Sequence, residues 1–212
     1  MYLFLRNGRI APGNDREALE WAAGITEQVN QITGLRVGLF ATVFSPEAGT
    51  LSWGSFVPDL AALEAAGDKL QADGAFQDNV AKGVKLGMGG LDDSLLQVLY
   101  GEPDPDATVQ YVSTVQSVCA NGNFARGVEV GIEIAKRADA ATGSSTLFVL
   151  GSTGVYGGVG WLTGFPDIQA LEASAQSLNA DPGFVEYVDR EASSAYVSDA
   201  GATQQRIWRR IV

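Results

Sequence analysis

Hydrophobic positions follow a helical period in some stretches of the chain and form short, strand-like runs in others. Ala18, Trp21 and Ile25 begin a series with three- and four-residue spacing that continues to Ile32. This spacing predicts an amphipathic helix that begins after Asn14, which stands at the N-cap position. Strands are predicted where β-branched, aromatic and leucine side chains cluster between turn residues, at 2–6, 36–44, 50–57 and 95–101.

The same pattern occurs twice along the chain. Residues 53–80 and 161–188 are identical at 12 of 28 positions when the sequence is shifted by 108 residues. Upstream, pairs such as Tyr2 with Tyr111 and Ile25 with Ile134 align at a shift of 109. The segment 101–108, GEPDPDAT, lacks an apolar pattern and has the Pro and Asp content of a linker. We therefore predict a first repeat at 1–100, a linker at 101–108 and a second repeat at 109–212.

Four aspartates mark helix starts at corresponding positions of the two repeats. Asp59 and Asp167 each follow a proline and precede an apolar helical segment, whereas Asp73 and Asp181 precede what we expect to be a further short turn. A carboxylate at such a position accepts hydrogen bonds from free backbone N–H groups and lies at the favourable end of the helix dipole. We interpret all four as helix caps rather than as paired acid–base groups, and Asn123, like Asn14, as an N-cap.

The order of elements in each copy is β-α-β-β-α-β. In the second copy the strands are expected near 109–118, 146–153, 158–165 and 203–211, and the helices near 124–142 and 167–178. This order is typical of a ferredoxin-like sheet with its helices on one face. The strands are apolar on both sides, so the helix-free face also needs cover. The predicted fold class is therefore α+β, with two tandem βαββαβ ferredoxin-like repeats forming an intramolecular dimeric α/β barrel.

One motif of the repeat resembles a known superfamily. A tryptophan in the third strand is followed by P-D-[LI]-x-x-L-E-A and then by L-x-A-D-x-x-F in both copies. This arrangement resembles the dimeric α+β barrel superfamily, with antibiotic-biosynthesis-monooxygenase-like and NIPSNAP-like proteins as the nearest relatives. The resemblance implies the barrel fold, and in the branch similar to quinol and anthrone monooxygenases it implies a site between sheet and helices.

Charge and composition exclude several classes of function. The chain has 14 Lys and Arg against 25 Asp and Glu, a formal net charge of -11, which disfavours nucleic acids and anionic membrane surfaces as partners. It has no histidine and a single cysteine, Cys119, so histidine-dependent catalysis and histidine ligation of zinc or haem are excluded. We expect a cytoplasmic protein without metal or cofactor that is either a monomeric pseudo-dimer or a homodimer.

Three aromatic residues are the candidates for substrate binding. Trp53 and Trp161 occupy equivalent third-strand positions, where each is either a stacking wall for an aromatic substrate or an anchor of the helix–sheet core; we favour the core anchor. Tyr156 lies in the glycine-rich segment 151–161, which we interpret as a hairpin turn rather than a phosphate loop because no Lys-Ser/Thr pair follows. Its side chain is expected at the tip of the turn, at the entrance of a pocket.

Two classes of function fit these residues. The first is a small-molecule enzyme, a cofactor-independent monooxygenase-like protein acting on an aromatic or quinol substrate whose own carbanion reduces oxygen. The second is a non-catalytic binding or structural scaffold, which the lack of convergent ionisable residues away from helix caps favours. The catalytic residues and the substrate are not assigned by the sequence.

Overall fold

Each copy folds as a strand, a helix, two strands, two helices and a final strand. The computed structural model describes residues 1–212 except 12, 14, 87–89 and 200. The first copy contains β1 (Tyr2–Arg9), α1 (Asp15–Thr33), β2 (Gly38–Val43), β3 (Thr50–Val57), α2 (Leu60–Ala72), α3 (Gly74–Lys85) and β4 (Asp92–Tyr100). The second contains β5 (Tyr111–Val118), α4 (Phe124–Thr142), β6 (Thr146–Gly151), β7 (Gly158–Phe165), α5 (Ile168–Ala180), α6 (Pro182–Ala195) and β8 (Gln204–Arg210). None of the helices in the described ranges combines the length and apolarity of a membrane-spanning segment.

The aspartate caps are confirmed. In each copy, one of them begins a helix where only a short turn was predicted. The carboxylates of Asp59 and Asp167 accept hydrogen bonds from the backbone N–H groups three residues later, at 2.8 and 2.7 Å. Asp73 and Asp181 each end one helix and begin the next. The expected short turn after each of them is in fact a full helix, α3 or α6, because one aspartate in an extended conformation serves both helix ends.

Of the two asparagines that were predicted to be N-caps, Asn14 lies outside the described residues. Asn123 stands at the N-cap position of α4 but makes no side-chain capping bond. Its Nδ2 instead donates to the carbonyl of Ser194 at 2.9 Å, so the prediction that this side chain caps the helix is wrong. The amide ties the start of α4 to the end of α6.

The strands are hydrogen-bonded as a closed barrel in the order β1-β3-β2-β8-β5-β7-β6-β4. In this order each copy contributes the ferredoxin-like succession β4-β1-β3-β2 or β8-β5-β7-β6, which confirms the predicted fold class. The described ladders β1·β3, β2·β3, β4·β6, β5·β7 and β6·β7 are all antiparallel.

The chain divides into two compact units that do not coincide with the sequence repeats. Unit 1 comprises residues 1–95 and 209–212, and unit 2 comprises residues 96–208. Within unit 2, Leu96 to Tyr100 of β4 pair with β6. Within unit 1, the backbone of Leu39 bonds to Val212 at 3.0 Å and to Ile211 at 2.8 Å. Each unit therefore contains the end of the other copy's last strand.

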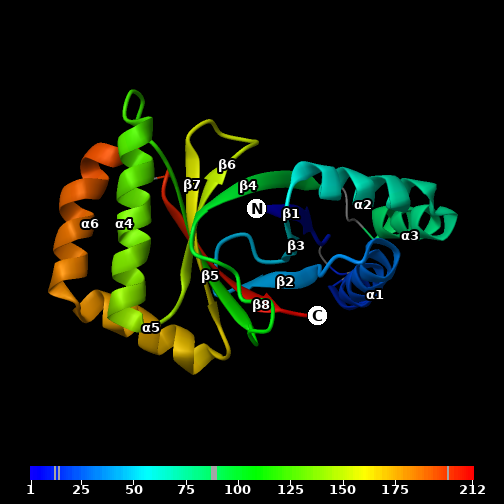
Figure 1. Cartoon of the computed structure of the whole chain (residues 1–212). Helices are drawn as coiled ribbons and strands as arrows, with labels where there is room; N and C mark the ends of the chain where they lie inside the picture. The colour runs from blue at the N-terminus through cyan, green and yellow to red at the C-terminus, as the bar shows by residue number, and fades with distance from the viewer. Residues whose placement is uncertain (12, 14, 87–89, 200) are drawn as a thin grey trace. The chain divides into compact units, whose positions relative to one another are not determined.

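Each unit has its own core between sheet and helices. In unit 1, helices α1, α2 and α3 gather on one side of the β1-β3-β2 ladder (Figure 1). Its buried core consists of Ile10, Ala18, Ala22, Leu39 and Leu51. In unit 2, α4 and α6 pack together along the sheet (Figure 1). Its buried core consists of Cys119, Val130, Ala135, Phe148, Val159, Trp161, Ala195 and Tyr196.

Candidate functional site

Trp53 lies between β3 and α1 in unit 1 and is half-buried. Its indole Nε1 donates to the hydroxyl of Thr26 at 2.9 Å, and Thr26, which is 1% exposed, donates in turn to the carbonyl of Ala22 at 2.6 Å. The ring of Trp21 meets it edge to face, with centroids 6.2 Å apart. The orientation of the Trp53 ring is therefore set by α1.

A close helix approach holds Trp21 in place. Its Nε1 donates to the carbonyl of Asn79 on α3 at 2.9 Å. A Cβ added at Gly83 would lie 2.2 Å from the Trp21 ring, so only glycine allows α3 to pack this closely against α1. Asn79 Nδ2 donates to Gln28 at 3.0 Å and adds a second link between the two helices.

Trp161, the equivalent residue of unit 2, is enclosed. It is 9% exposed, and its Nε1 donates to the carbonyl of Gly131 at 2.8 Å. The rings of Phe148 and Tyr196 lie 5.4 and 5.5 Å from it. The Tyr196 hydroxyl donates to the carbonyl of Gly127 at 2.6 Å, and burial raises its pKa well above the usual value. This ring is a core anchor of unit 2.

A size exchange beside each tryptophan contributes to the difference between the two. Leu39 is the cross-strand neighbour of Trp53, and Phe148 is the cross-strand neighbour of Trp161. The larger Phe148 ring fits because Gly131 stands on the facing helix, where a Cβ would lie 2.2 Å from the ring. The first copy has alanine at the aligned position, residue 22. The second copy therefore fills with an aromatic ring the space that the first copy leaves to a leucine.

Tyr156 lies between β6 and β7, as expected, and is 86% exposed. Its ring stacks on Phe124 at the start of α4, with centroids 5.9 Å apart and planes 21° apart. Among the described contacts, the partners of Tyr156 and those of Trp161 are different residues. The structure therefore does not bring these two candidates into one cluster.

Four residues of β1 and β3 form a polar and aromatic patch on the face that carries Trp53. The register places Arg6 opposite Trp53 and Phe4 opposite Ser55, and directly opposed residues share a face of the sheet. Arg6 Nε and Nη2 donate to the two carboxylate oxygens of Asp93, each at 2.7 Å. The guanidinium carbon of Arg6 lies 5.7 Å from the centre of the Phe4 ring. Ser55 is 4% exposed, and its hydroxyl is buried with no hydrogen-bond partner among the described residues.

The local sequence pattern does not predict this patch, although the two repeats differ at its positions. The second copy has Ser113 and Val115 where the first has phenylalanine and arginine. It has Thr163 where the first has Ser55, and the Thr163 hydroxyl is hydrogen-bonded to that of Thr146 at 3.0 Å. Aligned positions that differ in chemistry between two otherwise similar copies indicate which copy has a specialised surface.

The remaining candidates have structural environments. Cys119 is 5% exposed, and burial raises the pKa of its thiol, which disfavours a reactive thiolate. Within the described part of the chain, no three Cys, Asp or Glu side chains are grouped so that they could hold a metal ion.

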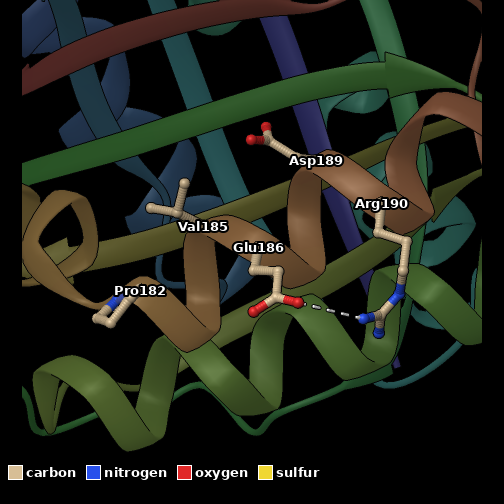
Figure 2. A pocket seen from close by; sticks show the side chains of 5 residues that line it. All are labelled: Pro182, Val185, Glu186, Asp189 and Arg190. Carbon is tan, nitrogen blue, oxygen red and sulfur yellow. Dashed lines mark ion pairs between the residues drawn. The ribbon is translucent and has the colours of Figure 1, made fainter.

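A shallow, open depression lies along α6. Figure 2 shows Pro182, Val185, Glu186, Asp189 and Arg190 on this helix, with Glu186 and Arg190 paired at 3.9 Å. All five side chains come from one helix, so this is a solvated helix face rather than an enclosed site.

Comparison with known proteins identifies relatives of the fold. No protein-family model and no curated protein matches the sequence. Among solved structures, the chain is similar to a "putative monooxygenase" from Fusobacterium nucleatum, with a TM-score of 0.71 and 10% identity over 100% of this chain and 92% of the other. It is similar to a "putative monooxygenase" from Lactobacillus acidophilus, with a TM-score of 0.67 and 9% identity over 99% and 93%. An anthrone oxidase-like protein matches with a TM-score of 0.68 and 9% identity over 100% and 91%.

At this level of identity the similarity shows the fold alone. It covers the whole chain, and therefore both repeats, in each of the three matches. The chain thus has the dimeric α+β barrel fold that its repeat motif resembles, built as a tandem fusion of two ferredoxin-like copies.

Proposed function

We propose that this chain binds a flat aromatic small molecule beside Trp53 in unit 1 and oxidises it as a cofactor-independent monooxygenase, with hydroquinones and anthrones as the substrate class. The observation that carries the proposal is the difference between the two tryptophans. Trp53 is half-buried and fixed through Thr26, whereas Trp161 is enclosed by Phe148 and Tyr196. A rigid and partly accessible indole is suited to stacking an aromatic ligand.

The reaction needs few catalytic groups from the protein. An anthrone reacts with one molecule of oxygen to give the anthraquinone and water, and the substrate supplies all four electrons. The protein then needs to bind the ring, orient it and favour the loss of its proton. Trp53, held by Thr26, serves the first two needs. The "putative monooxygenase" and anthrone oxidase-like neighbours support this reaction class, since they share the fold over the whole chain.

A non-catalytic scaffold is the second candidate, and the core of unit 2 favours it. Trp161 is hydrogen-bonded to Gly131 and packed between two aromatic rings, which is the arrangement of a structural residue. If unit 1 holds no ligand either, both copies serve only the stability of the barrel.

Oxygen uptake with anthrone and with menadiol, a naphthohydroquinone, tests the proposal. We expect the full chain to consume oxygen faster than the protein-free solution does. Trp53→Phe should lower kcat/KM by about 5-fold, because the smaller ring stacks over less area and loses the hydrogen bond to Thr26, changes worth about 1 kcal/mol together.

The matched control is Trp161→Phe, which removes the equivalent ring from the closed core of unit 2. We expect this variant to unfold at lower temperature but to retain the turnover of the wild type while it is folded. Uptake that never exceeds the protein-free rate, together with no binding of either compound, would leave the scaffold as the better interpretation.

A further inference from the structure

The loop between β6 and β7 and the start of α4 present large apolar side chains to the solvent. The side chains of Val155 and Tyr156 are 67% and 86% exposed, and Tyr156 stacks on Phe124, which is 37% exposed. The backbone holds the two segments together, since Cys119 donates to the carbonyl of Gly157 at 2.8 Å. Exposed aromatic and apolar side chains that gather on one surface are typical of a contact with another molecule.

The surroundings of Phe124, Val155 and Tyr156, here called the uncharged surface, lack acidic and basic side chains. Backbone hydrogen bonds join segment 119–125 to segments 151–157 and 192–198. None of the three segments contains a charged residue, although the chain has 25 Asp and Glu among 212 residues. Arg126 and Glu191, which border these segments, form an ion pair with each other. Depletion of charge around exposed aromatic rings is the composition of the centre of a protein interface.

The first copy has a different chemistry at the aligned positions. Its backbone makes the same contact, from the N–H of Ile10 to the carbonyl of Gly49 at 2.9 Å, so the two loops correspond. Where the first copy has two acidic residues and an alanine, the second copy has three large apolar or aromatic side chains. The aligned pairs are Asp15 with Phe124, Glu47 with Val155 and Ala48 with Tyr156. The fold does not require the uncharged surface, since the first copy forms the same loop without it.

We propose that the uncharged surface binds the same surface of a second copy of this chain, so that two chains form a two-fold dimer. Charge favours this partner. Two copies with a formal net charge of -11 repel each other where their acidic residues meet, and an uncharged surface avoids this repulsion. A two-fold contact places a surface against itself, and apolar side chains are complementary to themselves, whereas charges of one sign are not. Tyr156 then contacts the second copy, and the inference is independent of the aromatic site beside Trp53.

Sedimentation velocity of the full chain over a concentration series tests the inference. We expect a monomer at about 1 μM and a growing dimer population toward about 200 μM, because three side chains from each copy supply only the centre of a small interface. Added salt should leave the dimer unchanged or tighten it, since salt screens the repulsion between acidic copies and no ion pair forms the contact. A dimer that dissociates as the salt concentration rises would contradict the proposed contact.

Two variants and a matched control locate the contact. Val155→Glu introduces the residue type of the first copy at a largely exposed position, so it should not change the unfolding temperature of the monomer. Across the two-fold axis it brings like charges together, and we expect the dimer dissociation constant to rise at least about 10-fold. Tyr156→Ala should weaken the dimer comparably, because tyrosine is a common anchor of interfaces. Phe44→Ala removes an equally exposed ring, at 86%, from the corresponding loop of unit 1 and should dimerise like the wild type.

Three further results would overturn the inference. The first is a wild type that stays monomeric throughout the series. The second is a dimer that Val155→Glu and Tyr156→Ala leave intact, or that Phe44→Ala also abolishes, since either result places the contact on another surface. The third is sedimentation of the wild type with neutral phosphatidylcholine vesicles that Tyr156→Ala abolishes, which would assign the surface to a lipid. All of these readouts are separate from oxygen uptake, so the proposed function stands or falls without them.

Discussion

In each unit, a single glycine allows a helix to pack closely against an aromatic ring of a neighbouring element. Gly83 lets α3 approach the Trp21 ring, and Gly131 lets α4 accept the Phe148 ring. In both cases the missing side chain is replaced by an aromatic ring from another element. These positions determine the local packing around Trp53 and Trp161, and they depend on volume rather than on a special backbone angle.

Gly83→Ala should therefore destabilise the protein, although alanine normally favours a helix. The added methyl group must displace the Trp21 ring, and such overpacking costs about 1–3 kcal/mol. Gly67→Ala is the matched control, because a Cβ at Gly67 in α2 meets no atom within 4 Å. We expect that control to gain about 0.5–1 kcal/mol. Urea unfolding followed by circular dichroism gives both values, and equal stability of the two variants would contradict the packing argument.

At the scale of elements, the two copies join their first and last helices by different means. In unit 1 the contact between α1 and α3 is made by Trp21 over Gly83. In unit 2, Glu191 of α6 instead pairs with Arg126 of α4 and with Arg190 at 2.9 Å. The same topology thus uses a tryptophan–glycine contact in one copy, whereas the other adds ion pairs to the contact of Arg137 on α4 with the Tyr187 ring on α6.

This difference predicts a pH dependence that belongs to unit 2. The hydrogen bonds from Arg190 and Arg126 lower the pKa of Glu191 in the folded protein. A carboxylate with a depressed pKa stabilises the fold above its unfolded pKa of about 4.3, and that contribution is lost as the pH falls through the folded value. Glu191→Gln should lower the melting temperature at pH ~7, where the wild-type carboxylate is ionised, and the difference should shrink in acid. Glu64→Gln on the exposed face of α2 serves as the control, and a constant difference across the pH range would refute the explanation.

At the scale of the whole molecule, each compact unit takes the end of a strand from the other repeat. Residues 96–100 pair with β6 in unit 2, and Leu39 in unit 1 bonds to the last two residues of the chain. Without these segments, β6 and β2 would present unpaired backbone groups along an edge. The units therefore depend on the continuity of the chain.

Separate expression of residues 1–104 and 105–212 tests this dependence. We expect neither fragment alone to unfold cooperatively, because each lacks a segment that its unit requires. Mixing the two fragments should restore a cooperative transition and yield a one-to-one complex. Circular dichroism melts and light scattering after size exclusion measure both effects. A fragment 105–212 that melts alone like the full chain would disprove the dependence.

Features that depend on neighbouring residues in the chain were determined by the sequence. The boundaries of β3, β7 and α4 agree with the predicted ranges 50–57, 158–165 and 124–142. These elements are marked by turn residues, caps and apolar periods that lie within them. The duplication then gave the element order twice, and with it the fold class. The full length of α3 and α6 escaped prediction, since one aspartate serves two helices and no other signal separates them.

Features that depend on distant residues were decided only by the tertiary structure. Trp53 and Trp161 occupy equivalent positions in the repeat, yet one is half-buried and the other enclosed. Trp161 is enclosed by Tyr196 and by Phe148, whose ring fits against Gly131 on another element. Likewise, Arg6 meets Asp93 across 87 positions of the chain. Enclosure and charge pairing are properties of surfaces that fold together, so the local pattern determines which elements form and their packing determines how deeply each of two equivalent positions is buried.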